Sequence, residues 1–337
     1  MLVNREGSFI GMLVHRKISK QPLFLPGGRR LDFSGPALVM AVVNCNEDSF
    51  YPASRAAGKE AVERALEAEE EGASIIDFGG ESTRPGSSYI DEEEELRRVI
   101  PAIKDFRKRS SLPVSVDTRK ARVARAALDE GADIINDISG LDDDPDMARL
   151  CADSGAAVVL VHKKGLPLTM QEEPVYTNLF DELADFFRAA VERACGAGIS
   201  AGRIILDPGF GFGKTVANNL EILRRIVYGA GASCDMSNAC DAGITCNAGA
   251  ALNGTAAKAK PFPRLAEICG KEYPLLIGLS RKQFIGELTG RDLQGRLAGT
   301  LAANGAAILG GADIIRVHDV GEHVDLAKVL FALRPED

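Results

Sequence analysis

Eight short apolar runs recur along the chain, and each run ends in a polar or charged residue. The runs are rich in β-branched residues and lack an alternating polar face, which is typical of strands buried on both faces. We expect strands at residues 38–43, 75–78, 114–116, 134–136, 157–161, 204–206, 275–278 and 314–317. Stretches of helical periodicity separate them, at about 59–71, 91–108, 120–129, 146–153, 179–197, 218–226, 293–309 and 324–333.

Eight strands that alternate with eight helices predict a single α/β domain, a (β/α)8 TIM barrel of parallel strands. A doubly wound open sheet would show the same alternation, but the count of eight favours the closed barrel. A weak internal repeat supports the alternation, because glycine before a strand suits a left-handed residue that closes the preceding helix. Such Gly-Ala pairs stand at 72–73, 131–132, 155–156 and 311–312.

The polar residues that end the apolar runs are the candidate site. In parallel barrels the carboxyl ends of the strands share one face, and that face carries the chemistry. We therefore expect these residues to form one pocket although they span most of the chain: Asn44, Asp77, Asp117, Asn136, His162, Asp207, Ser280, Arg281, Lys282, Arg316 and His318.

Two regions lie outside the barrel pattern. Residues 1–34 precede the first strand, and the sequence Pro-Gly-Gly at 26–28 predicts the turn of a small hairpin at the barrel floor, which leaves residues 35–337 for the barrel itself. Residues 228–262 are rich in Ala, Gly and Asn and contain too few large apolar residues to bury a core. They predict a flexible insertion between the sixth helix and the seventh strand.

Composition and charge limit the classes of partner. The net charge is −8, and no stripe of Lys and Arg is interleaved with aromatic residues, which argues against a nucleic acid partner. No apolar run approaches the length of a membrane span. Residues 1–20 contain no apolar core followed by a small-residue cleavage site, so we do not expect a secretory signal. Seven scattered cysteines without a Cys-x-x-Cys pair fit a reducing compartment, so we expect a cytoplasmic protein that acts on small molecules.

Seven motifs follow the strands in order. They are Asn-Cys-Asn-Glu-Asp-Ser-Phe at 44–50, Glu-Ser-Thr-Arg-Pro-Gly at 81–86, Ser-Val-Asp-Thr-Arg-Lys at 115–120, Ile-Asn-Asp-Ile at 135–138, Asp-Pro-Gly-Phe-Gly-Phe-Gly-Lys at 207–214, Gly-Leu-Ser-Arg-Lys at 278–282 and Arg-Val-His-Asp-Val at 316–320. Each motif alone is weak, but the ordered set is specific. From about residue 37 to 333, without the insertion, the chain closely resembles dihydropteroate synthase, a pterin-binding TIM-barrel family of folate biosynthesis.

The resemblance implies a transferase that condenses 6-hydroxymethyl-7,8-dihydropterin pyrophosphate with p-aminobenzoate. The products are 7,8-dihydropteroate and pyrophosphate, and Mg²⁺ assists. It also implies a homodimer and a target of sulfonamides. The arylamine is already nucleophilic, and departure of pyrophosphate can leave a cation that the reduced pterin ring stabilises. Catalysis then rests on positioning and electrostatics rather than on a strong base.

A pterin presents adjacent N–H donors on its amino-pyrimidinone edge, which a carboxylate can accept in bidentate fashion. Asp207 is the candidate for that edge, Asn136 for the neighbouring ring nitrogens, and Asp117 for a further N–H donor. Taken alone, Asp207 is equally a turn residue before a proline, and Asp117 a helix cap. The resemblance implies that the pterin pocket consists of Asp117, Asn136, Ile138, Asp207, Phe212, Lys282 and Arg316.

The leaving diphosphate requires cations. Arg316 and His318 alternate along the last strand, so their side chains share one face. Asn44 and Arg84 are further candidates for the diphosphate, and Asn44 is the candidate ligand of Mg²⁺, which needs few protein ligands. The implied catalytic set is Lys282, Arg316, His318 and Asp117. The loops that close over p-aminobenzoate, and its other contacts, are matched by Phe50, Thr83, Arg84, Pro85, Phe212 and Gln283.

The chain departs from the family pattern in four places. Cys45, Asn46 and Glu47 stand where the first loop has Val-Thr-Pro, and Tyr51 to Ser54 replace the glycine-containing part of that loop. Lys163 adds a charge after the fifth strand, and Gln283 stands where a serine often occurs. The string Gly209 to Lys214 is not a phosphate loop, because the first glycine of a Walker motif would fall on a proline.

Two alternatives stay open at this point. The altered first loop supports a non-catalytic pterin-binding paralogue. A methyltetrahydrofolate-dependent methyltransferase shares the pterin barrel, but the anion-binding residues near the last two strands argue against it.

Overall fold

The computed structural model describes residues 21–45, 54–81, 89–165, 170, 174–228, 267–268 and 271–334 of the 337-residue chain. Eight parallel strands form the central sheet, in the order β11-β12-β3-β4-β5-β6-β7-β8. Their bounds are β3 (Leu38–Asn44), β4 (Ile75–Gly79), β5 (Val114–Asp117), β6 (Ile134–Asp137), β7 (Ala157–Val161), β8 (Ile204–Asp207), β11 (Leu276–Ile277) and β12 (Ile314–Val317).

The sheet closes on itself between β8 and β11. A parallel bridge joins Leu206 to Leu275, and the backbone N–H of Leu206 donates to the carbonyl of Pro274 at 2.9 Å. This confirms the expected (β/α)8 barrel over the open sheet. All eight strands agree with the expected ranges to within one residue at each end, because strands buried on both faces give unbroken apolar runs.

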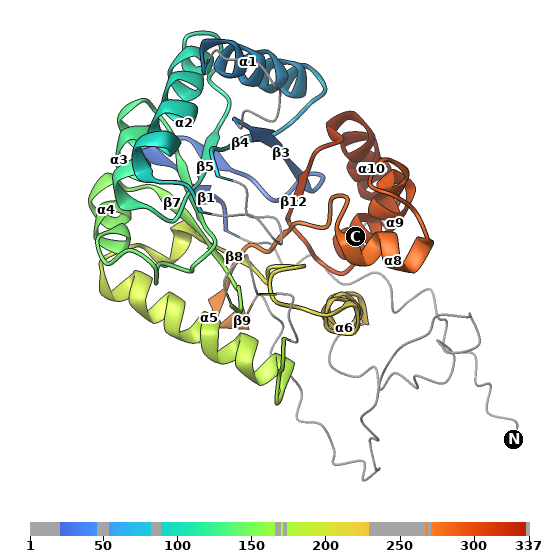
Figure 1. Ribbon diagram of the computed structural model, residues 1–337. Coiled ribbons are helices and arrows are strands. Elements are labelled where there is room, and N and C mark those ends of the chain that lie inside the picture. Colours follow the sequence, from blue (N-terminus) through green and yellow to red (C-terminus); the bar gives the residue numbers. More distant parts are fainter. Residues whose placement is uncertain are drawn as a thin grey trace, which may run out of the picture.

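Helices surround the barrel (Figure 1). Their bounds are α1 (Ser54–Glu70), α2 (Glu92–Arg107), α3 (Ala121–Asp129), α4 (Met147–Ser154), α5 (Leu179–Gly196), α6 (Val216–Tyr228), α8 (Gln283–Thr289), α9 (Leu297–Leu309) and α10 (Val320–Ala332). The sequence pattern did not predict α8, which has seven residues and is too short to show a period. The glycines of the four Gly-Ala pairs all have positive φ, between +70° and +102°, as their position after a helix requires.

An antiparallel hairpin of β1 (Leu23–Phe24) and β2 (Arg30–Leu31) plugs the amino-terminal end of the barrel. Its buried side chains, with Leu25 and Phe33, pack against Ile75, Ile134 and other residues that begin the strands. The Arg29 guanidinium pairs with Asp133, which is fully buried and also accepts from Arg107 at 2.6 Å. The expected hairpin at the barrel floor is confirmed.

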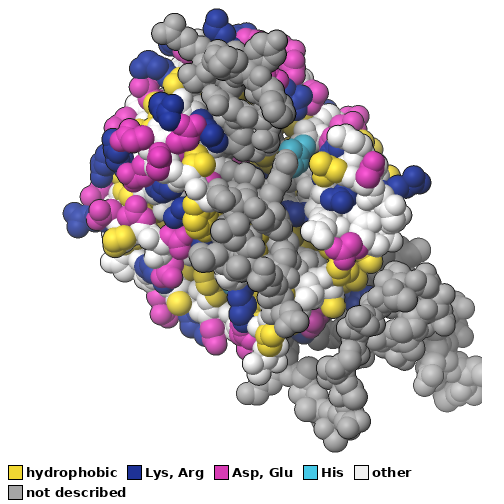
Figure 2. Space-filling model, viewed as in Figure 1, with side chains coloured by type: hydrophobic (Ala, Val, Ile, Leu, Met, Phe, Trp, Pro, Cys, Tyr) yellow, Lys and Arg dark blue, Asp and Glu magenta, His cyan; other side chains and the backbone are white. Residues whose placement is uncertain are grey.

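The expected flexible insertion at 228–262 lies outside the described residues, apart from Tyr228 at the end of α6. A short antiparallel pair, β9 (Glu267–Ile268) and β10 (Lys271–Glu272), precedes the seventh barrel strand. Among the described residues, no helix has the length and apolar character that crossing a membrane requires. Acidic and basic side chains are intermixed on the face seen in Figure 2, where no large patch of one sign stands out.

Candidate active site

Four polar side chains meet at the carboxyl ends of β4, β5, β6 and β12. Arg316 Nε donates to Asp77 Oδ2 at 2.6 Å, and its Nη2 donates to Asp117 Oδ2 at 2.8 Å. Asn136 Nδ2 donates to the same Asp77 oxygen at 3.3 Å. Asp77 and Arg316 are 239 positions apart in the chain. The barrel topology alone brings them together, because the carboxyl ends of parallel strands share one face.

This cluster keeps acceptor atoms that the described residues do not use. Asp77 Oδ1 and Asn136 Oδ1 are buried and have no hydrogen-bond partner among the described residues. A buried polar atom without a partner costs about 1–3 kcal/mol, so such atoms commonly face a ligand or ordered water. The cluster therefore suits a ligand that supplies N–H donors.

The electrostatics of the cluster favour such donors. Burial raises the pKa of Asp117 to about 7, although the Arg316 cation opposes the rise. Burial disfavours the cation of Arg316, but the charges of Asp77 and Asp117 outweigh this and raise its pKa. One guanidinium thus faces two carboxyl groups, and the surplus acceptors attract positively polarised hydrogens.

Asp207 ends β8 and lies buried at the same barrel face. Its Oδ1 accepts the backbone N–H of Gly209 at 2.8 Å. Burial raises the pKa of Asp207 to about 6, and the nearby Lys282, Arg316 and Lys214 cations oppose the rise. Asp207 is therefore a second carboxyl group that can exist in either protonation state near neutrality.

Lys282 and Phe212 lie side by side near Asp207. Lys282 Nζ is 4.4 Å from the centre of the Phe212 ring, a cation–π contact. Of the other residues expected in this pocket, Ile138 is buried directly after β6. Gln283 is exposed at the start of α8 and donates to Glu287 at 2.9 Å.

The last two barrel strands supply the candidate anion side. Ser280 Oγ lies 3.0 Å from His318 Nδ1 and accepts the His318 backbone N–H at 3.2 Å. Arg281 does not join this pair: it has φ +53° and makes a bidentate ion pair with Asp319 at 2.6 and 3.0 Å. Asn44 is exposed at the end of β3, the strand that pairs with β12.

Four residues of the expected site lie outside the described residues: Phe50, Thr83, Arg84 and Pro85. Of the altered first loop, only Cys45 is described. Its side chain is buried in the core that contains the helix residues and lies outside the barrel interior, so it packs as an apolar residue would.

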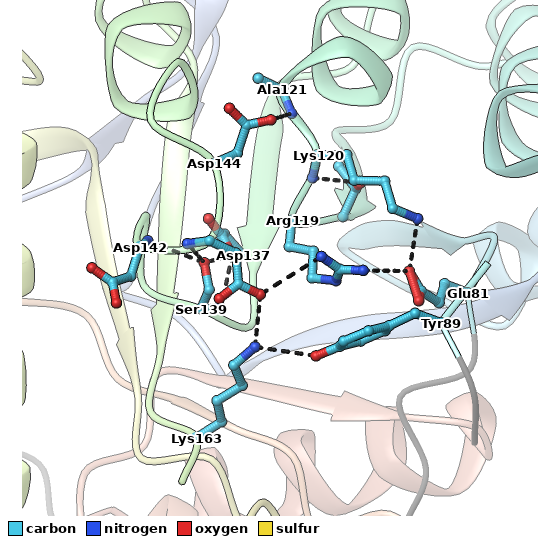
Figure 3. A network of polar contacts seen from close by, with 12 residues as sticks. Glu81, Tyr89, Arg119, Lys120, Ala121, Asp137, Ser139, Asp142, Asp144 and Lys163 are labelled. Atoms are coloured by element: carbon cyan, nitrogen blue, oxygen red, sulfur yellow. Dashed lines mark hydrogen bonds and ion pairs between the residues drawn. The ribbon is translucent and has the colours of Figure 1, made fainter. Parts of the chain in front are cut away.

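A rim network links the loops after β4, β5, β6 and β7. Lys120 Nζ is buried and donates to Glu81 at 2.9 Å and to Glu95 at 2.5 Å. The Arg119 guanidinium lies 3.6 Å from the centre of the Tyr89 ring. Figure 3 shows that Lys163, from the end of β7, also reaches toward Tyr89.

The charge that Lys163 adds lies within this rim network. Its Nζ donates to Asp143 at 2.8 Å and lies 3.3 Å from the Tyr89 hydroxyl. The charge is matched within the rim network. Sequence reasoning had singled out the motifs that contain Glu81 and Lys120, but nothing local indicated that these two residues pair.

Two more residues make contacts that the sequence does not predict. The sequence places Asp77 at a strand end but does not indicate its partner Arg316, because a pairing across the barrel leaves no local signal. Lys214 is the last residue of a string that is not a phosphate loop, and nothing near it in the sequence predicts its contacts. The structure places it inside the fold, with Nζ 2.8 Å from His162 Nδ1.

A closed parallel barrel, with carboxyl groups, an amide and cations gathered at its carboxyl face, defines an enzyme of the TIM-barrel class whose pocket suits a heterocycle rich in N–H donors. Comparison with known proteins makes this specific. The family model "Pterin binding enzyme" matches residues 40–229 and 242–318.

Curated relatives agree. Dihydropteroate synthase of Synechocystis is 37% identical over 312 residues, covering 92% of this chain and 94% of that protein. The Escherichia coli K12 enzyme is 38% identical over 306 residues, covering 90% and 94%. The solved structure of Xanthomonas albilineans dihydropteroate synthase with 4-aminobenzoic acid is 36% identical and superposes with a TM-score of 0.73, covering 94% of this chain and all of that one. The chain belongs to the dihydropteroate synthase family of pterin-binding enzymes.

Proposed function

We propose that this protein condenses 6-hydroxymethyl-7,8-dihydropterin pyrophosphate with p-aminobenzoate to form 7,8-dihydropteroate and pyrophosphate. One observation supports this most strongly: the buried Asp77–Arg316–Asp117–Asn136 cluster keeps acceptor atoms that have no partner in the described part of the chain. A reduced pterin carries N–H donors that match such acceptors.

In this proposal Asp207, Asn136 and Asp117 hold the pterin ring. Asp207 accepts hydrogen bonds from the N–H groups of the amino-pyrimidinone edge. Asn136 Oδ1, which has no partner among the described residues, accepts a hydrogen bond from a ring N–H. Lys282 donates to the ring carbonyl, and Ile138 and Phe212 pack against the rings. A charge-assisted hydrogen bond contributes about 1.5–3 kcal/mol, so these contacts suffice to fix one orientation.

The diphosphate lies toward Arg316, His318 and Asn44, with Arg84 as a further donor. Ser280 Oγ, 3.0 Å from His318 Nδ1, orients the imidazole toward the leaving group. Bond cleavage between the pterin methylene carbon and the diphosphate oxygen then leaves negative charge opposite fixed donors. One such donor lowers the free energy of the transition state by about 3 kcal/mol.

p-Aminobenzoate enters above the pterin, against Phe212 and Lys282, and its amine attacks the methylene carbon. The amine loses a proton as the C–N bond forms. Phe50, Thr83, Pro85 and Gln283 are its further proposed contacts.

The described residues contain no group of three or more His, Cys, Asp or Glu side chains that would hold a metal on its own. The donors near the diphosphate are an amide and cations. The Asn44 amide oxygen would be the protein ligand of a Mg²⁺ bound to the diphosphate, because Mg²⁺ typically uses few protein ligands beside water and substrate oxygens. When bound, the ion would neutralise charge on the leaving group.

We also propose a cytoplasmic homodimer. The exposed apolar side chains of Val329, Phe331 and Leu333, at the end of α10, supply a surface for a second copy.

The experiment is a complete reaction with the pterin pyrophosphate, p-aminobenzoate and Mg²⁺, in which dihydropteroate is identified by mass. We expect product only when both organic substrates are present, with pyrophosphate released in equal amount. Pterin binding without product would instead support the non-catalytic paralogue.

A further inference from the structure

Lys214 holds the glycine-rich loop after β8 from within. Its side chain is almost fully buried, at 2% exposure. Nζ lies 2.8 Å from His162 Nδ1, 2.9 Å from the Gly209 carbonyl, 3.1 Å from the Phe212 carbonyl and 3.3 Å from the His162 carbonyl. An ammonium has three hydrogens, so these four acceptors occupy it fully. No donor remains for a phosphate.

The loop needs such an anchor, because its own backbone is permissive. Gly209, Gly211 and Gly213 all have positive φ, at +67°, +79° and +62°. Glycine is required by space as well: a Cβ at Gly209 would lie 1.9 Å from the His162 carbonyl oxygen. Chains with alternate glycines lose much entropy on ordering, so side-chain contacts must supply the rigidity.

The partner of Lys214 is arranged to accept. His162 is buried, and its ring packs edge-on against the ring of Phe186, with the two ring centres 4.9 Å apart. Burial and the neighbouring lysine charges lower the pKa of His162 well below its ordinary value, so the ring is neutral. Neutral acceptors therefore surround the amine, and burial lowers the pKa of Lys214 to about 7.

The anchored loop carries Phe212, whose ring faces the Lys282 ammonium. Lys214 bonds the carbonyl of Phe212 itself, so it fixes the backbone from which the ring projects. The position of Asp207 depends less on Lys214, because Asp207 is held by strand pairing. Its backbone carbonyl accepts the His162 backbone N–H at 2.9 Å, at the end of the pairing between β7 and β8.

We propose that Lys214 is a positioning residue for p-aminobenzoate: it fixes the loop so that Phe212 and Lys282 form a preorganised surface for the aromatic substrate. This inference rests on the proposed function. Preorganised contacts bind more tightly because less ordering remains to be done on binding. Loss of the anchor should weaken the binding of p-aminobenzoate much more than that of the pterin, because Asp117 and Asn136, which also hold the pterin, lie on other strands.

The test is Lys214→Met, which keeps the length and removes the ammonium. Its matched control is Lys164→Met, a neighbouring lysine whose side chain is 39% exposed and pairs with Glu182. We expect Lys214→Met to raise the KM for p-aminobenzoate about tenfold or more, while the Kd of the pterin pyrophosphate changes by less than about threefold. The control should change neither.

A double-mutant cycle with Phe212→Ala separates positioning from general damage. If Lys214 acts through Phe212, adding Lys214→Met to Phe212→Ala should raise the KM for p-aminobenzoate by less than about twofold. Independent, multiplying effects would overturn the proposal, as would an unchanged KM in Lys214→Met.

If Lys214→Met does not fold, Lys214→Arg carries the test. Its larger, planar guanidinium keeps the charge but does not match acceptors arranged around a compact ammonium, so the KM for p-aminobenzoate should still rise by about threefold or more. Unchanged KM values for both substrates would overturn the proposal. Wild-type protein without turnover would instead refute the proposed function, so the two failures are distinguishable.

Discussion

Asp207 and Asp117 show how the environment of a single residue decides what it can bind. Burial raises their pKa values to about 6 and about 7. The sequence indicated both residues, because a strand end in a barrel predicts a position on the functional face. It indicated Asp77 as a strand end, but it did not indicate that Asp77 pairs with Arg316, 239 positions away, or that Lys214 is buried against His162. Both depend on contacts between residues far apart in the sequence, which no local pattern records.

The raised pKa of Asp207 predicts opposite pH trends for stability and for binding. In the unfolded chain this carboxyl group has its ordinary pKa of 3.8, so folding favours its protonated form. Its contribution to the free energy of unfolding is therefore fully present below pH 3.8 and is lost as the pH rises through about 6. Pterin binding needs the carboxylate, because the ligand supplies the N–H donors. We expect the dihydropterin to bind about tenfold more weakly at about pH 5 than at neutral pH in calorimetric titrations. Constant affinity over that range would contradict the assignment.

At the scale of elements, the barrel strands followed from the apolar runs, and the hairpin from its Pro-Gly-Gly turn. The short helix α8 did not follow, because seven residues carry no reliable period. The hairpin lies at the amino-terminal end of the barrel, opposite the site, and its apolar side chains complete the interior. We therefore assign it to stability and not to binding.

Two adjacent residues of β1 test this. Leu23 is 1% exposed and faces the barrel interior, whereas Phe24 is 52% exposed. Leu23→Ala should lower the free energy of unfolding by about 3 kcal/mol, and Phe24→Ala by less than about 0.5 kcal/mol, in denaturant titrations. Equal effects would show that the hairpin does not pack as described.

At the scale of the whole molecule, closure of the barrel converts residues spread over most of the chain into one cluster. This much was predictable, because it follows from topology. The surface on which a second copy would bind was not predictable, because such a surface has no periodic signature. The exposed apolar end of α10 is the structural feature that supports a dimer, and Val329 is 57% exposed there.

Sedimentation velocity checks the dimer. We expect the wild-type chain to sediment as a dimer and Val329→Glu to shift it toward monomer, because a buried unpaired charge opposes association. Val175→Glu is the matched control, since Val175 is 72% exposed and lies before α5. A monomeric wild type, or a dimer unaffected by Val329→Glu, would refute this surface.

The central claim is that the strand ends form one pterin pocket, and calorimetric titration of the dihydropterin pyrophosphate into wild type and Asp207→Asn tests it most directly. Asparagine keeps the shape and an acceptor for the Gly209 N–H, which Asp207 Oδ1 accepts at 2.8 Å, but cannot accept two pterin donors as a carboxylate does. We expect wild type to bind and Asp207→Asn to lose about a hundredfold or more in affinity. Equal affinity in the two proteins would contradict the pocket.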